Sequence, residues 1–135
     1  MMRKKRLIII LAIIILLSSS IAFAQNIFEK IWKSNELTAK ANSLVNKGKY
    51  DEAIEIFKEA IEIMPESGST HYHFAKLYIQ LGEKEKAISL LETYLEYVEG
   101  VKTYVNAADK LKCRELLDSL KENRPEKPFE ELIKQ

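Results

Sequence analysis

The residue types that most often carry catalysis or bind metals are sparse in this chain of 135 residues. The only histidines, His71 and His73, are two positions apart, so on a helix they do not form the i, i+4 pair that shares a metal. The single cysteine, Cys113, has no paired cysteine or histidine in the sequence, and burial as a small apolar residue is its usual state. A nucleophile elbow, a phosphate-binding glycine loop and an H-E-x-x-H motif are all missing from the sequence. We therefore expect no catalytic residue, no metal site and no cofactor, and a protein that is not an enzyme.

The elements that would position any binding residues are helices. After residue 25, glycine and proline are scarce, and the apolar residues between them recur at the i, i+3, i+4, i+7 spacing of a helix. Two stretches show this best: Ala53, Ile54, Phe57, Ala60, Ile61 and Met64, and then Ala87, Ile88, Leu91, Leu95 and Val98. Short glycine-containing turns between helices favour antiparallel neighbours, so the pattern predicts an all-α chain.

A period of 34 residues relates two parts of this helical region. Gly48 and Gly82 are in register, and each is expected to take the left-handed conformation that ends a helix. The other matched positions are Ala41 with Ala75, Leu44 with Tyr78, Ala53 with Ala87, Phe57 with Leu91, and Ile61 with Leu95.

This pattern resembles the tetratricopeptide repeat, a 34-residue helix-turn-helix unit. Residues 34–67 and 68–101 correspond to two such units. The second departs from the family at Tyr94, where a small alanine is expected, so we expect the element after it to be pushed away. Residues 102–124 continue the register as one capping helix, which lacks a turn glycine. The resemblance thus implies a short α-solenoid of two antiparallel helix-turn-helix repeats plus a C-terminal capping helix, preceded by a helical extension at 25–33 and followed by a tail with a short helix at 125–135.

The first 24 residues have the pattern of a secretory signal peptide. Four cations at positions 3–6 precede an unbroken apolar run from Leu7 to Leu17, and the segment ends on Ala22-Phe23-Ala24. We expect cleavage after Ala24 and export to the periplasm or the extracellular space. The alternative is a membrane anchor formed by residues 7–24, since their length is close to that of a span. In that case the membrane is contacted only through this segment.

The charge of the mature chain narrows the class of partner. Removal of the four signal cations leaves 17 Lys and Arg against 20 Asp and Glu. A mildly acidic protein without a basic run is not expected to bind nucleic acid. A single cysteine allows no intramolecular disulfide, so stability must come from packed apolar surface.

The resemblance also implies an interaction surface, because proteins of this family receive extended peptides on the inner face of the first helix of each unit. Carried over position by position, this surface comprises Asn35, Thr38, Asn42 and Asn46, then Tyr72, Lys76 and Gln80, and finally Asn106, Lys110 and Arg114. The spacing of four residues places each of the last two groups on one helix face. Amides and cations suit an acidic peptide or a C-terminal carboxylate. A merely solvated face is the alternative.

We therefore predict an exported adaptor or scaffold of the cell envelope that holds a segment of a protein partner in its concave face. The alternative is a structural or membrane-anchored envelope protein that self-associates, as a homodimer for example, without a peptide-binding groove. Its exposed apolar contacts would then be Phe28, Trp32, Tyr94, Tyr97 and Phe129.

Overall fold

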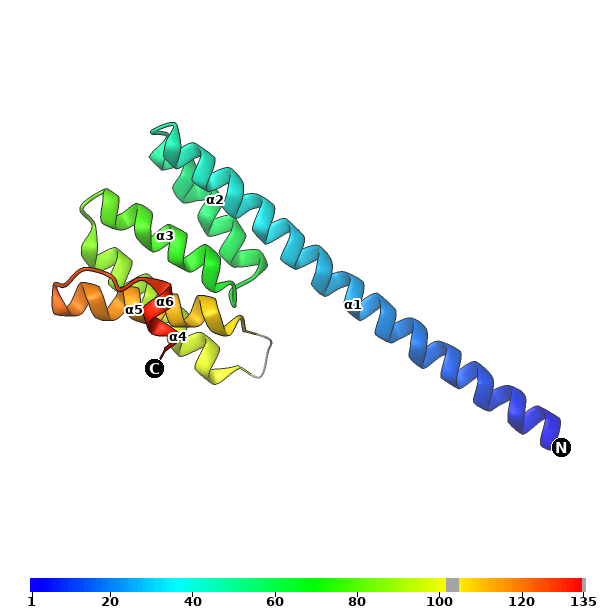
Figure 1. The fold of residues 1–135 in the computed structure, drawn as a ribbon. Helices are drawn as coiled ribbons and strands as arrows, with labels where there is room; N and C mark the ends of the chain where they lie inside the picture. Colours follow the sequence, from blue (N-terminus) through cyan, green and yellow to red (C-terminus); the bar gives the residue numbers. More distant parts are fainter. Residues whose placement is uncertain (102–104, 135) are drawn as a thin grey trace. The chain divides into compact units, whose positions relative to one another are not determined.

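Figure 1 shows the computed structural model of the chain, which describes residues 1–101 and 105–134. These residues form helices joined by turns and short irregular segments, without a strand, which confirms the predicted all-α class for the described part of the chain. The chain divides into two compact units, Met1–Trp32 and Lys33–Gln135. The helices are α1 (Met2–Asn46), α2 (Tyr50–Ile63), α3 (Gly68–Gln80), α4 (Lys84–Gly100), α5 (Ala107–Glu122) and α6 (Phe129–Leu132).

The first unit lies within α1. A window of 18 residues in this helix has a mean hydropathy of 2.9 and no buried residue, so the helix is long and apolar enough to cross a membrane. Near the end of the unit the side chains of Phe28 and Trp32 are also exposed. A signal sequence and a membrane anchor share these properties. Cleavage after Ala24 therefore stays a prediction.

The second unit begins with a helix pair formed by the end of α1 and by α2. Two residues of the turn between them bond back to α1: the N–H of Gly48 donates to the carbonyl of Val45, and that of Lys49 to the carbonyl of Leu44. Gly48 has a φ of 73°, which a residue with a side chain seldom adopts. These bonds form a Schellman motif, which satisfies carbonyls at the helix end and reverses the chain.

The second helix pair, α3 and α4, repeats this turn 34 residues later. The N–H of Gly82 donates to Ile79, and that of Glu83 donates to Tyr78, with a φ of 75° at Gly82. The same motif at the same register confirms the predicted role of both glycines.

The two pairs share an apolar core at their small and aromatic positions. Ala41, Ala53 and Phe57 are fully buried, and Phe57 stacks on Phe74 of α3 with ring centroids 5.1 Å apart. Alanine allows the helix backbones to approach, and the aromatic rings fill the space between the pairs.

The element after the second pair is α5, which packs against both α3 and α4 through Cys113, Leu116 and Leu117. It begins at Ala107, five residues later than the predicted capping helix, and the predicted helical residues 102–104 lie outside the described part. Asn106 explains the start, because its side chain accepts hydrogen bonds from the N–H groups of Ala108 and Asp109 as an N-cap. At the other end Asn123 has a φ of 54°, and the chain then turns back along α5 to α6 (Figure 1).

Candidate interaction surface

The surface predicted from the family resemblance falls on three helices of the second unit. Tyr72, Lys76 and Gln80 follow one another at four-residue spacing along α3, with Tyr72 half-buried and the other two exposed. On α1, Asn42 is half-buried, whereas Asn35 and Asn46 are exposed. On α5, Lys110 is half-buried and Arg114 is exposed.

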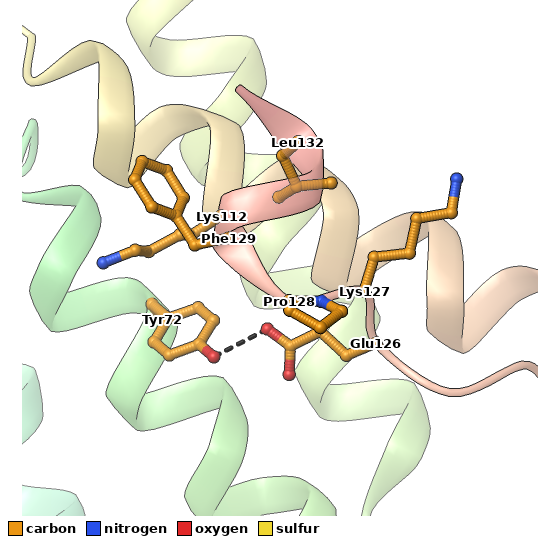
Figure 2. Close-up of a pocket in the computed structure, with 7 residues that line it drawn as sticks. All are labelled: Tyr72, Lys112, Glu126, Lys127, Pro128, Phe129 and Leu132. Carbon is orange, nitrogen blue, oxygen red and sulfur yellow. Dashed lines mark hydrogen bonds between the residues drawn. The ribbon is translucent and has the colours of Figure 1, made fainter. Parts of the chain in front are cut away.

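Tyr72 and Lys76 converge on a single carboxylate. The Tyr72 hydroxyl donates to Oε1 of Glu126 at 2.6 Å, and the Lys76 ammonium donates to Oε2 at 3.0 Å. Figure 2 shows the Tyr72 hydroxyl directed at this carboxylate. Burial raises the pKa of Tyr72 and the hydrogen bond to Glu126 raises it further, so the hydroxyl stays protonated and remains a donor. Charge-assisted bonds of this kind are the stronger class of hydrogen bond.

Glu126 belongs to the C-terminal tail, which we define as residues 124–132. The tail also contributes Pro128, Phe129 and Leu132 to a hollow of about 260 Å³, lined on the opposite side by Tyr72 and Lys112 (Figure 2). The Lys112 ammonium lies 4.9 Å from the centroid of the Phe129 ring, within the range of a cation–π contact. Tyr72 and Lys76 of α3 therefore hold a carboxylate, and Lys112 of α5 contacts the aromatic residue three positions later.

A second carboxylate, that of Glu115 on α5, holds the beginning of the tail. Both terminal nitrogens of the Arg124 guanidinium donate to it, and the Lys127 N–H donates to its Oε1 at 2.9 Å. Glu115 is only 7% exposed. The hydrogen bond from Arg124 lowers the pKa of Glu115, so the charged form is favoured in the folded chain.

Three predicted surface residues have other roles or other partners in the structure. Asn106 is the N-cap of α5, where its side-chain oxygen accepts hydrogen bonds from the N–H groups of Ala108 and Asp109. Arg114 donates to Glu99 at the end of α4, at 2.8 Å. Gln80 donates to the Tyr50 hydroxyl at 3.1 Å. Of the predicted surface residues, only Tyr72 and Lys76 meet at one acidic group within the described part of the chain.

Thr38 of α1, which the family resemblance placed on the groove, is instead buried against α3. Its hydroxyl donates to the Ser34 carbonyl at 2.8 Å and lies 2.8 Å from the Thr70 hydroxyl, which in turn lies 2.8 Å from the Ser67 hydroxyl. Because each hydroxyl has one proton, Thr70 must donate to Thr38 and Ser67 to Thr70. This hydroxyl chain joins the two helix pairs and removes Thr38 from the candidate surface.

The tail itself was predicted, but its contribution to this surface, and that of Lys112, was not predicted from the sequence. The signal that could have found the tail is the pair of prolines around Glu126, because they keep residues 125–128 out of a helix and leave a carboxylate near an aromatic ring.

The two histidines have structural surroundings. His71 is buried, its Nδ1 donates to the Ser67 carbonyl at 2.8 Å, and its ring stacks on Tyr94 with centroids 4.6 Å apart. Burial lowers the pKa of His71 to about 4, so the ring is neutral near neutral pH. Burial also lowers the pKa of His73. Within the described residues no group of three His, Cys, Asp or Glu side chains is placed to hold a metal ion.

Tyr94 departs from what its sequence position suggested. It is 1% exposed, so it is neither a surface contact for self-association nor a residue that displaces the next element. The space comes from Gly68, where an added Cβ would lie 2.5 Å from the Tyr94 hydroxyl. Among the described residues this hydroxyl has no hydrogen-bond partner. A glycine at the start of the second repeat thus accommodates the oversized residue near its end.

Two helix-turn-helix units with the same Schellman turn define a short α-solenoid, the architecture of helical-repeat proteins. Residues 44–108 match the model of the tetratricopeptide repeat family. The match runs from the end of α1 to the beginning of α5 and includes both glycine turns. It supports a tetratricopeptide repeat protein and confirms the predicted fold, and such repeats generally act as protein-interaction modules rather than as enzymes. Neither the curated proteins nor the solved structures gave a match to this chain.

Proposed function

We propose that this protein is an adaptor of the cell envelope that binds an acidic segment of a partner protein on the face of α3 formed by Tyr72 and Lys76. The observation that carries the proposal is the geometry at Glu126, where a hydroxyl and an ammonium from one helix face bond to the two oxygens of one carboxylate. The side chains that the family places on its peptide-binding face are thus also arranged to bind an acidic group.

The electrostatics of this surface favour an acidic ligand. Lys112 of α5 lines the hollow, and the ammonium of Lys76 on α3 lies 5.8 Å from the ring of Tyr72, which also lines it. Among the described residues, α3 and α5 contribute no acidic side chain to this lining. An incoming carboxylate therefore finds an ammonium and a protonated hydroxyl, whereas a basic ligand would meet like charge.

The cellular location that we propose rests on the apolar part of α1. We propose that its apolar part directs export, with cleavage after Ala24, and that the retained anchor is the alternative. Both arrangements put the repeats on the far side of the membrane, because the cations at 3–6 stay on the cytoplasmic side. The adaptor would then meet partners in the envelope.

The test is binding of acidic peptides to the full-length chain in detergent, compared with its charge-reversal variants. We expect Lys76→Glu to weaken binding about tenfold or more, because it removes a charge-assisted bond and adds a like charge. Lys58→Glu is the matched control, since Lys58 lies on α2 and pairs only with Glu55 among the described residues. Equal binding by the Lys76 variant and the wild type would refute the assignment of the surface. Equal losses in both variants would refute it too, because they would indicate unspecific attraction.

A further inference from the structure

We infer that the tail is a built-in competitor for this surface, and that the partner segment has the same chemistry as the tail: a carboxylate followed three residues later by an aromatic ring, with the backbone between them kept extended by proline. The inference rests on the proposed function, because it names the ligand and the regulation of the same site. The pattern within this chain is Glu126-Lys127-Pro128-Phe129.

The tail engages the surface as a peptide ligand would. Glu126 lies outside any helix, and its carboxylate, with a side chain 23% exposed, bonds across to α3 through Tyr72 and Lys76. The sequence separation is large, 54 residues for Tyr72 and 50 for Lys76, so the contact is tertiary and does not stabilise a local turn. Phe129 occupies the adjacent position against Lys112.

Few apolar contacts hold the tail, so a partner segment can displace it. Its helix α6 has four residues and no buried side chain. Its contacts with the repeats are the polar ones at Glu126 and Glu115 and those of three side chains that line the hollow, Pro128, Phe129 and Leu132. Segments with few buried apolar contacts are the ones that open at low free-energy cost.

A tethered ligand such as the tail competes effectively even when its contacts are few. A segment joined to its site by a short linker has an effective concentration on the order of millimolar. A partner segment with the same pattern displaces the tail only if its concentration is above this effective concentration or if it makes extra contacts, for example with Gln80 and Asn46. The tail would thereby exclude weak or wrong ligands.

The experiment measures binding of a fluorescein-labelled peptide, with the sequence of residues 124–134, to the full-length chain in detergent by fluorescence anisotropy. The releasing variant is Glu126→Gln, which keeps the size of the side chain and removes its charge. Glu130→Gln is the matched control, because Glu130 is an exposed acidic residue of α6 that does not line the hollow. A second releasing variant, Glu126→Gln with Phe129→Ala, covers the case in which the ring alone keeps the tail in place.

If the tail competes in cis, one or both releasing variants bind the peptide about tenfold more tightly than the wild type, and the control variant binds it as the wild type does. A peptide with glutamine in place of its first glutamate binds the releasing variants several-fold more weakly. Equal affinity of the wild type and both releasing variants would overturn the inference, and so would the absence of binding to all of them.

The two proposals fail in different ways. If other acidic peptides still bind and Lys76→Glu still weakens their binding, the proposed function stands while the tail loses its role. If Lys76→Glu has no effect on any acidic peptide, the proposed function falls.

Discussion

Gly68 is the position at which one added methyl group should disturb the second repeat most. A Cβ there would lie 2.5 Å from the Tyr94 hydroxyl and 2.9 Å from the Cβ of Asp109. Tyr94 cannot move away easily, because it is buried and its other side stacks on His71. Overpacking of a filled site costs about 1–3 kcal/mol, so Gly68→Ala should lower the free energy of unfolding of the repeats by that amount.

Cys113 provides the assay, because it is the only cysteine in the chain and its thiol lies at the same contact. The thiol is fully buried and donates to the Gly68 carbonyl at 3.2 Å. Burial raises the pKa of Cys113 to about 12, so the thiol reacts slowly with a labelling reagent unless α3 and α5 separate. A loss of about 1–3 kcal/mol raises the open population, and with it the labelling rate, by about 5- to 150-fold.

Two further variants isolate the cause. Gly100→Ala is the matched control at a helix end, because an added Cβ there has no atom within 4 Å. Since alanine favours a helix more than glycine does, this variant should label Cys113 at the wild-type rate or more slowly. Tyr94→Phe removes the clashing hydroxyl and should restore a large part of the stability that Gly68→Ala loses. Labelling of Gly68→Ala at the wild-type rate would refute the predicted clash, and so would an acceleration that persists when Tyr94→Phe is added.

Three buried polar groups, His71, Thr38 and Glu115, give further tests. The pKa of His71 falls from 6.5 to about 4 on folding, so between these pH values the unfolded chain binds a proton that the folded chain does not. Acidification to pH 4 should therefore lower the free energy of unfolding by about 3 kcal/mol. Urea titrations should show this loss in the wild type but not in His71→Phe. Thr38→Val should destabilise the repeats by about 1–2 kcal/mol in the same titrations, because it leaves Thr70 without its acceptor. Because the pKa of Glu115 is lowered on folding, its carboxylate stabilises the folded chain above pH 4.5, and this stabilisation is lost as the pH falls below that value. Glu115→Gln should therefore speed hydrogen exchange at the Lys127 N–H at neutral pH, and unchanged exchange would argue against its role in holding the tail.

The helices of the repeats could be predicted from the sequence because local signals and packing agree there. Gly48 and Gly82 mark the turns through their backbone conformation, which depends on few neighbours, and the 34-residue period then places the helix pairs. The beginning of α5 was predicted less well, because the N-cap at Asn106 competes with a helical periodicity that runs through it.

The fit between Tyr94 and Gly68 could not be predicted, since it joins two residues 26 positions apart and depends on the side-chain geometry of the folded repeat. Family position alone suggested a misfit at Tyr94. The physical solution is compensation, in which a missing side chain on one helix provides the volume that a large ring on the next requires.

The candidate surface was predicted in part. Four-residue spacing is enough to place Tyr72 and Lys76 on one helix face. Thr38 occupies an equivalent family position, but its hydroxyl has partners on α3 that no local pattern reveals. The tail contact at Glu126 is set by the reversal of the chain after Asn123, and the sequence does not show where a reversed segment comes to lie.

The central claim is that the α3 face binds a carboxylate of another protein at Lys76. Carbodiimide cross-linking tests it most directly, because this reagent joins an amine to a carboxylate only when the two are in contact. The sample is the Glu126→Gln chain in detergent with an acidic peptide of the tail pattern, and the joined residues are identified by mass spectrometry. We predict a cross-link between the glutamate of the peptide and Lys76. Cross-links spread over the exposed lysines, with Lys58 on α2 joined as often as Lys76, would contradict the claim.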